Sequence, residues 1–260
     1  MSKNANQARG ARPGTPPRGA PRGPRFASLD RVARAIVACE RCPRLRRHCE
    51  QVARERRRAY RDQVYWGKPV PGFGDAAARL LVVGLAPAAH GGNRTGRVFT
   101  GDSSGDWLYA ALYAQGFANQ AESVARDDGL RLAGAYVTAA ARCAPPGNRP
   151  TRAELERCRG YLGAEIRLLE RVRVVLALGR IAHEAWLRAS GWWSLPPRER
   201  PRFAHGAEAT LPDGTVLIAS YHPSRQNTQT GRLTLAMWSA VFRRARELLG
   251  PGPGIPTPSL

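Results

Sequence analysis

Short apolar runs alternate along this chain with longer stretches in which apolar residues recur at helical spacing. Four of the runs have the length and composition of buried strands, and they cover residues 79–83, 135–140, 172–178 and 215–220. Strands that alternate with helices form parallel βαβ units, whose helices cover both faces of one sheet. Right-handed crossovers leave few ways to connect such units. We therefore expect a three-layer α/β/α sandwich built on a four-stranded parallel sheet.

The residues that precede the helical patterns predict where helices begin. Ser28 has the position of a helix cap, because apolar residues follow it at helical spacing. Ser103 or Ser104 can cap a second helix. Thr151 and Glu154 have the spacing of a capping box at the start of a third. Two more helices are expected over residues 181–188 and 233–249.

The two ends of the chain differ in composition from the segment between them. Residues 1–27 contain six Lys or Arg, no acidic residue and many Gly and Pro. Such a segment cannot bury enough apolar surface to fold, so we expect a disordered basic arm. Residues 250–260 are rich in proline and are expected to form a disordered tail. Residues 28–249 are left as one folded domain.

The excess of positive charge restricts the class of partner. The 260 residues contain 41 Lys and Arg but only 20 Asp and Glu, which gives a formal net charge of +21. An excess of this size favours nucleic acid over an acidic membrane surface or protein. No apolar run approaches the ~20 residues that span a bilayer, and the N-terminus has no hydrophobic signal core. We expect a monomeric, cytoplasmic protein that associates with the nucleoid and not with a membrane.

Four of the five cysteines have the arrangement of a ligand set. Cys39 and Cys42 form a C-x2-C pair, Cys143 follows the second expected strand, and Cys158 lies early in the next helix. Thiolates brought together in this way suit either tetrahedral zinc or an iron–sulfur cluster, and the spacing does not choose between them. The alternative is a set of separate buried thiols, which are common for free cysteine. Cys49 is left outside the set.

Two loops rich in polar and small residues directly follow predicted strands and hold the other candidate residues. They cover residues 84–102 and 222–227. Because ligands of open α/β sheets bind at the carboxyl ends of the strands, the two loops should line one pocket. Backbone N–H groups in residues 84–88 can bind carbonyl oxygens or an anion. Phe99 is either a stacking surface for a planar ligand or a core residue, and His222 is either a hydrogen-bond donor or a structural residue.

The sequences of these loops carry a family resemblance. Residues 84–102, Gly-Leu-Ala-Pro-Ala-Ala-His-Gly-Gly-Asn-Arg-Thr-Gly-Arg-Val-Phe-Thr-Gly-Asp, resemble motif one of the uracil-DNA glycosylase superfamily, in the version of its family 5, or type B, enzymes. His222-Pro-Ser resembles the second motif of that superfamily. The cysteine set is similar to the iron–sulfur set of families 4 and 5. The resemblance covers about residues 28–249.

This resemblance implies a structural [4Fe–4S] cluster in preference to zinc, and a role in base-excision repair. The enzyme would flip uracil, and other deaminated bases, out of double-stranded DNA and hydrolyse the N-glycosidic bond. Phe99 would stack on the flipped base, and His222 would stabilise the negative charge on the leaving base. The base would also be bound by Gly84, Leu85, Ala86 and His90, and the duplex would be entered by Arg225, Gln226 and Asn227.

Some positions depart from the wider superfamily. Ala86 stands where other families place an acidic residue or Asn to position water, so Asp102, His90 and Asn93 are the remaining candidates for that role. Asp102 has the alternative role of a helix N-cap. Ala139 stands where relatives often carry Asn, so strict selectivity for uracil is not expected. Neither loop contains lysine, which predicts a monofunctional enzyme without a Schiff-base step.

Two other classes of function fit the sequence less well. A non-catalytic nucleic-acid-binding protein stapled by a metal would explain the charge and the cysteines, but not Phe99 and His222 in facing loops. A nucleotide hydrolase would need metal-binding carboxylates in the loops, and only Asp102 is available there.

Overall fold

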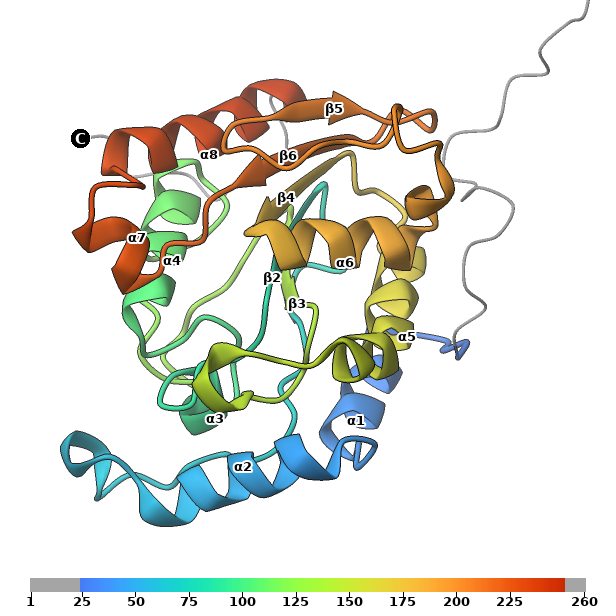
Figure 1. The fold of residues 1–260 in the computed structure, drawn as a ribbon. Helices are drawn as coiled ribbons and strands as arrows, with labels where there is room; N and C mark the ends of the chain where they lie inside the picture. The colour runs from blue at the N-terminus through green and yellow to red at the C-terminus, as the bar shows by residue number, and fades with distance from the viewer. Residues whose placement is uncertain (1–23, 251–260) are drawn as a thin grey trace, which may run out of the picture.

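One mixed sheet runs through the protein, which the computed structural model describes from residue 24 to residue 250 (Figure 1). Its six strands lie in the order β1-β3-β2-β4-β6-β5. The edge strands β1 (Phe73–Gly74) and β5 (Glu208–Thr210) are antiparallel to their neighbours. The four inner strands are parallel, and they are β3 (Ala135–Ala139), β2 (Leu80–Gly84), β4 (Val174–Leu178) and β6 (Val216–Ser220). All four inner strands therefore end at the same edge of the sheet.

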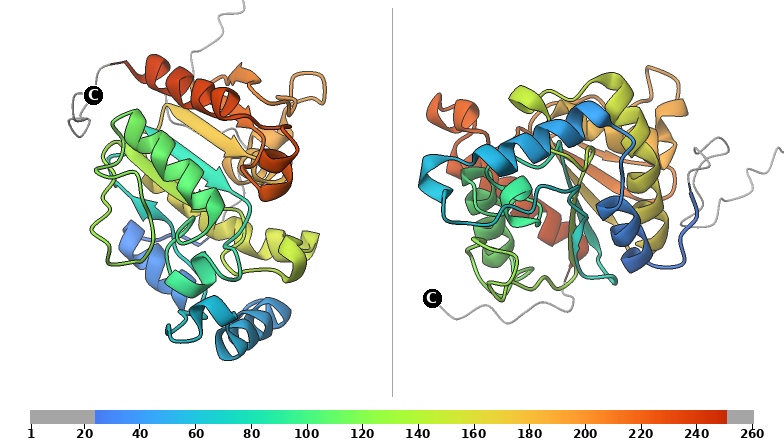
Figure 2. Two further views of the ribbon diagram at one scale, coloured as in Figure 1. Left: turned by 90° about the vertical axis from the view of Figure 1, so that its left-hand side faces the viewer. Right: turned by 90° about the horizontal axis from the view of Figure 1, so that it is seen from below.

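Helices cover both faces of this sheet and complete three layers (Figure 2). α4 (Ser103–Ala114) and α8 (Leu235–Leu249) pack on one face. α5 (Arg152–Leu168) and α6 (Arg180–Ser190) pack on the other, and α1 (Leu29–Val37) lies against α5. The remaining helical segments are α2 (Pro43–Glu55), α3 (Gly92–Thr95), α7 (Arg225–Gln229) and the 3-10 turns η1 (Arg58–Tyr60), η2 (Pro146–Asn148) and η3 (Trp192–Ser194).

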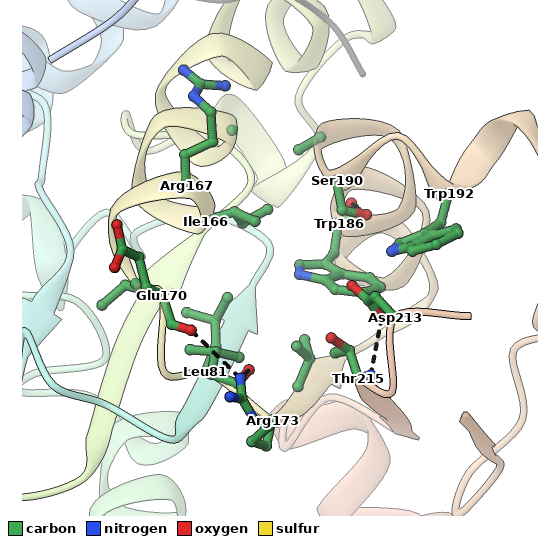
Figure 3. Close-up of a pocket in the computed structure, with 15 residues that line it drawn as sticks. Leu81, Ile166, Arg167, Glu170, Arg173, Trp186, Ser190, Trp192, Asp213 and Thr215 are labelled. Carbon is green, nitrogen blue, oxygen red and sulfur yellow. Dashed lines mark hydrogen bonds between the residues drawn. The ribbon is translucent and has the colours of Figure 1, made fainter. Parts of the chain in front are cut away.

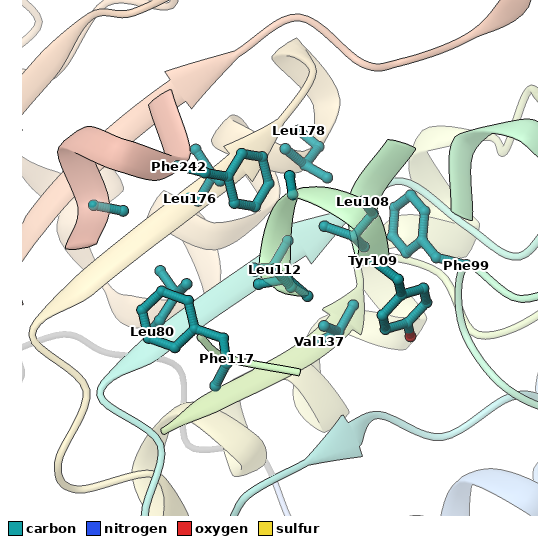
Figure 4. Close-up of a cluster of buried hydrophobic side chains, with 14 of the residues drawn as sticks. Leu80, Phe99, Leu108, Tyr109, Leu112, Phe117, Val137, Leu176, Leu178 and Phe242 are labelled. Carbon is teal, nitrogen blue, oxygen red and sulfur yellow. The ribbon is translucent and has the colours of Figure 1, made fainter. Parts of the chain in front are cut away.

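Apolar side chains fill both interfaces of the sheet, because successive residues of a strand point to opposite faces. Leu80, Leu176 and Phe242 belong to the cluster beneath α4 and α8 (Figure 4). Leu81 and Val83 belong to the cluster beneath α5 and α6. Burial on both faces is the reason that the inner strands form continuous apolar runs in the sequence.

The three layers and the parallel inner strands confirm the fold class that the sequence predicted. The predicted strand number was wrong, because the sheet has six strands and not four. β1 and β5 are short and partly exposed, so neither forms an apolar run that periodicity could detect. α2 was not predicted as a helix, since its buried residues are only Leu45, Arg46 and Cys49. The capping box at Thr151 is confirmed by reciprocal hydrogen bonds with Glu154.

The packed part of the chain begins before the predicted boundary at residue 28. The Phe26 ring stacks on Tyr161 of α5 with ring centroids 6.4 Å apart, and the Pro24 carbonyl accepts a hydrogen bond from Arg167. The rest of the predicted disordered arm and tail, residues 1–23 and 251–260, lies outside the described range. From residue 24 to residue 250, no helix has both the length and the apolar character needed to cross a membrane.

A buried ion pair joins the end of β3 to α5. The Arg142 guanidinium lies 2.6 Å from a carboxylate oxygen of Glu165, and both side chains are 1% exposed. The Thr138 hydroxyl donates to the same carboxylate oxygen at 2.7 Å. Removing one partner of such a pair leaves the other charge buried and uncompensated, which is strongly destabilising. The pair therefore fixes the segment that leads from β3 to Cys143.

Candidate functional site

The two loops predicted to line one pocket meet at the carboxyl edge of the sheet. The first follows β2 and the second follows β6. The rings of Phe99 and His222 stack with centroids 5.9 Å apart and an interplanar angle of 28°. The Ser104 hydroxyl donates to the Pro223 carbonyl at 3.0 Å. The ring contact joins the two loops directly, and the hydrogen bond joins the second loop to α4, which follows the first loop.

Phe99 adopts a backbone conformation that is unusual for a residue with a side chain. Its φ is 52°, in the left-handed region. A Cβ atom on Gly84 would lie 2.5 Å from the Phe99 ring, and one on Gly105 would lie 2.0 Å from the Phe99 carbonyl oxygen. Both positions therefore require glycine. The ring is pressed onto the end of β2 and remains 9% exposed beside His222.

The backbone of the first loop has N–H groups without a hydrogen-bond partner among the described residues. The carbonyls of Gly84 and Leu85 accept hydrogen bonds from the N–H groups of residues 140 and 141, which tie the loop to the end of β3. The N–H groups of Ala86 and Ala88 donate to no other group within residues 24–250. They are therefore available to a ligand, although ligand binding by this part of the loop stays a prediction.

Asp102 is the N-cap of α4. Its Oδ1 accepts hydrogen bonds from the backbone N–H groups of Ser104 and Gly105, both at 3.0 Å. The alternative role predicted for Asp102, as the N-cap of this helix, is confirmed, and the prediction that Ser103 or Ser104 is the cap was wrong. The second oxygen, Oδ2, makes no hydrogen bond within the described residues and lies against Gly91, where a Cβ would come within 1.9 Å of it. Burial raises the pKa of the Asp102 carboxyl.

Asn93 and His90 are engaged with the segment that precedes β1. The Asn93 amide nitrogen donates to the Cys49 carbonyl of α2 at 3.2 Å, while its buried Oδ1 has no partner among the described residues. His90 Nδ1 lies 3.0 Å from the Tyr65 hydroxyl. The pKa of His90 is lowered, first by burial and then by the nearby Arg57 and other cations. Both side chains anchor the first loop.

The three residues predicted to enter DNA lie on α7, directly after the second loop. Arg225 and Gln226 are exposed. Asn227 is partly buried, and its amide nitrogen donates to the His222 carbonyl at 2.8 Å. Asn227 therefore holds the backbone that carries His222, whereas its two neighbours are free to contact a partner.

A buried arginine that sequence reasoning did not single out fixes the first loop from its other side. The Arg97 guanidinium lies 2.6 Å from a carboxylate oxygen of Asp128 and 2.8 Å from the Ser123 hydroxyl. Although burial opposes ionisation of Asp128, hydrogen bonds from Arg97 and three backbone amides lower its pKa to about 2. The long sequence separation of these partners leaves no local signal of the contact.

The predicted cysteine ligands come from three segments that converge beside α5. Cys42, Cys143 and Cys158 are each 6% exposed. Burial is the largest cause that raises the pKa of Cys42 and Cys158, and the nearby Cys143 thiol raises both further. Cys39 lies beside the Tyr161 hydroxyl, and Cys49 lies beside Cys143. Within residues 24–250, no three His, Cys, Asp or Glu side chains are grouped closely enough to hold a metal ion.

A separate pocket of about 470 Å³ lies at the opposite edge of the sheet (Figure 3). It is lined by Leu81, Val175 and Thr215, near the amino ends of β2, β4 and β6, and by Ile166 and Trp186 of the covering helices. None of the residues predicted for the site lines this pocket. Since open parallel sheets bind ligands at the carboxyl ends of their strands, the meeting point of the two loops is the better candidate.

The imidazole of His222 is predicted to remain neutral at physiological pH. Burial lowers its pKa from 6.5 to about 4. Because the unfolded chain takes up this proton at a higher pH than the folded protein, the contribution of His222 to stability should fall as the pH drops below 6.5. An NMR titration of the His222 ring resonances would check this. A midpoint near 6.5 would contradict the buried environment described here.

Comparison with known proteins identifies the family. The model of the Uracil DNA glycosylase superfamily matches residues 71–246, a range that contains both loops and every strand of the sheet. Three relatives are similar over most of the chain, and each is named a type-5 uracil-DNA glycosylase.

The similarity to these relatives extends well beyond the loops. The protein of Thermus thermophilus is 53% identical over 224 residues, which is 85% of this chain and 100% of the relative. The protein of Mycobacterium leprae is 51% identical over 224 residues, or 86% of this chain and 96% of the relative. The protein of Pyrobaculum aerophilum is 46% identical over 216 residues, or 83% of this chain and 91% of the relative. The chain therefore belongs to the uracil-DNA glycosylase superfamily.

Proposed function

We propose that this chain removes uracil from DNA, as its type-5 relatives are named for doing, by hydrolysing the N-glycosidic bond of a base flipped out of the duplex. The observation that carries the proposal is the contact between Phe99 and His222, whose rings lie 5.9 Å apart where the two loops meet. A surface for a planar base and a group that can stabilise the charge of that base as it leaves are thereby placed together.

The flipped base would be bound largely by aromatic surface and backbone. It would lie against the Phe99 and His222 rings, with its carbonyl edge toward the free N–H groups of Ala86 and Ala88. Ala139, which is paired with Gly84 in the sheet, contributes only a methyl group at this edge. Backbone N–H groups can donate hydrogen bonds to any base that presents carbonyl oxygens. We therefore extend the proposal to other deaminated bases, in which a carbonyl has replaced an amino group.

Stabilisation of the leaving base would supply much of the rate enhancement. Cleavage of the C–N bond places negative charge on the base and positive charge on the sugar. His222 would donate a hydrogen bond to the base as a neutral imidazole, because burial holds its pKa at about 4. That hydrogen bond strengthens as charge develops, so it stabilises the transition state more than the bound substrate. Without a lysine in either loop, the reaction would end at an abasic site.

Asp102 is our candidate for positioning the attacking water. The capping hydrogen bonds use Oδ1, and they hold the carboxyl group in one orientation at the start of α4. Oδ2 has no hydrogen-bond partner among the described residues, so it can accept a hydrogen bond from water. Asn93 Oδ1, two residues beyond Gly91, is a second acceptor without a partner in the described part of the chain.

We also infer that Cys39, Cys42, Cys143 and Cys158 hold a structural [4Fe–4S] cluster. This inference is supported by the burial of Cys42, Cys143 and Cys158 on neighbouring segments, where Cys143 is near enough to raise the pKa of the other two thiols. It is also supported by the position of Cys39 beside Tyr161, one turn of α5 beyond Cys158. Four thiolate donors are the usual ligand set of such clusters. The residues would link the connection between α1 and α2 to the segment between β3 and α5, and the cluster would take no part in hydrolysis.

A non-catalytic nucleic-acid-binding protein is not favoured as an alternative. The Thermus thermophilus glycosylase is matched along 100% of its length, so the similarity is not confined to a binding segment. The ring pair in the facing loops also has no evident purpose in a protein that binds only the DNA backbone.

We predict that His222→Ala lowers the single-turnover rate of uracil excision about 10²–10³-fold, because it removes a donor that acts on the leaving base. Phe99→Ala should also slow excision, since stacking on an aromatic ring stabilises a base by about 1–3 kcal/mol. Release of free uracil from a duplex oligonucleotide would be measured at saturating enzyme. His48→Ala, on α2, is the control and should excise at the unaltered rate. If His222→Ala excises uracil at the unaltered rate, the second loop does not take part in the reaction.

The role of Asp102 can be separated from its capping role by two substitutions. Asp102→Ser retains a side-chain oxygen that can cap α4 but removes the second oxygen. It should therefore keep the thermal stability of the protein and lose most of the excision rate. Asp102→Ala removes both oxygens and should also lower stability by about 1 kcal/mol. If Asp102→Ser excises normally, the residue is a cap and another group positions the water.

We predict that the purified protein contains iron and inorganic sulfide and absorbs broadly in the visible range. Cys42→Ser should lose the iron and lower the thermal stability, because a ligand of the cluster is removed. Cys49→Ser, which replaces the cysteine outside the set, should retain the iron. Elemental analysis and thermal unfolding would measure both effects. Stoichiometric zinc without iron would overturn the proposed cluster.

A further inference from the structure

The segment between α2 and β1 has features that the site described above does not use. We call residues 56–65 the basic turn. It includes η1, and four exposed arginines lie within it: Arg56, Arg57, Arg58 and Arg61. The Val64 side chain is 88% exposed, more than any other large apolar side chain in residues 24–250. A turn that combines unburied arginines with an unburied valine has the chemistry of an interaction surface.

The remaining residues of the basic turn fasten it to the first loop. The Tyr65 hydroxyl lies 3.0 Å from His90 Nδ1. The Arg94 guanidinium donates to the Gln63 side chain at 2.6 Å and lies 4.1 Å from the centre of the Tyr60 ring. These contacts join three points of the turn to the loop that carries Phe99. The exposed arginines are thus held in a fixed position relative to the site.

Backbone hydrogen bonds just after the turn complete this attachment. The N–H group of Trp66 donates to the Arg94 carbonyl at 2.8 Å, and that of Gly67 donates to the Asn93 carbonyl at 3.0 Å. The turn follows the end of α2 at the lower left of Figure 1, on the same side of the protein as α7. The first loop of the site, which contains α3, is attached to the turn, and the second loop runs into α7.

We propose that the basic turn is a second DNA contact, in which its arginines bind phosphates beside the flipped nucleotide and Val64 packs against the sugar and base edges of the duplex. This inference rests on the proposed function. Arg225 and Gln226 are exposed on α7, so the duplex would be contacted from elements attached to both loops of the site. The basic turn would give affinity for any sequence, because phosphates carry no sequence information.

The arginines of the basic turn differ from the buried arginines of this protein in their interactions. Arg97 and Arg142 form ion pairs with buried carboxylates. The guanidinium groups of Arg58 and Arg61 make no hydrogen bond or ion pair within the described residues. Asp62 is the one acidic residue within the turn, and Glu55 directly precedes it. Phosphates are the ligands that would neutralise such cations on DNA, with release of counterions.

The charge contribution is tested by Arg58→Ala combined with Arg61→Ala. Binding to a uracil-free duplex would be measured over a range of salt concentrations. The slope of log affinity against log salt should become shallower by about 2, because two phosphate contacts are lost. Arg171→Ala combined with Arg243→Ala is the matched control, since it removes the same charge from exposed positions outside the turn and should leave the slope unchanged.

The apolar contribution is tested with substitutions that do not change charge. Val64→Thr keeps the shape of the side chain but makes it polar, and it should weaken duplex binding several-fold. Val64→Leu should retain binding. Because Val64 is 88% exposed in the free protein, neither substitution should change thermal stability. Equal affinities for the two variants and the unaltered protein would overturn the contact with Val64.

The outcomes separate this inference from the proposed function. An unaltered salt slope for the double arginine variant would overturn the basic turn as a phosphate contact, even if uracil is excised normally. A protein that fails to excise uracil but shows the expected change of slope would overturn the proposed function and leave the DNA contact standing. A change of slope that the control variant shares would assign the effect to net charge and would also overturn the inference.

Discussion

The close packing of Phe99 against two glycines is the constraint on which the site depends. A residue with a side chain in the left-handed region costs about 1–3 kcal/mol, and it persists only where the surroundings fix it. Here the Tyr109 hydroxyl donates to the Val98 carbonyl at 2.9 Å, and Arg97 is bound to Thr100 and Asp128 on the other side. These bonds hold the backbone on both sides of Phe99. The ring is thereby turned toward Gly84 and His222, where an extended backbone would not place it.

Arginine has two distinct uses in this protein. Arg94, Arg97 and Arg142 are buried and cross-link segments that are distant in sequence, and their partners are carbonyl oxygens, hydroxyl groups and carboxylates. The arginines of the basic turn are exposed, and among the described residues their guanidinium groups contact no carboxylate. A net charge of +21 does not distinguish these populations. The exposed arginines contribute most to the electrostatic attraction of a polyanion, because ion pairs neutralise part of the charge of the buried arginines.

The sequence was sufficient for those features that repeat locally. The inner strands are predominantly apolar along their length, and Thr151 and Glu154 form a capping box within one turn, so both were predictable. Asp102 was not recognised as the sole cap of α4, because the adjacent Ser103 and Ser104 fit the same preference and only the backbone geometry selects among them. The contacts of Arg97 with Asp128, and of Tyr65 with His90, join distant positions through side chains and have no periodic signal. The convergence of the two loops was predictable because strand topology determines it, whereas the left-handed Phe99 was not.

The site and the basic turn provide two different electrostatic environments, one poorly solvated and one exposed to solvent. Beside Phe99 the surroundings disfavour charge, since burial lowers the pKa of His222 to about 4 and raises that of Asp102. Ala86 adds no carboxylate there. A poorly solvated site of this kind gives a hydrogen bond to a developing anion more effect than it would have in water. The same environment could not bind phosphates well, because ionised partners there would be costly to desolvate. In the proposed function, affinity for a polyanion would therefore come from solvated cations outside the site, such as those of the basic turn, while hydrolysis would depend on neutral groups within it.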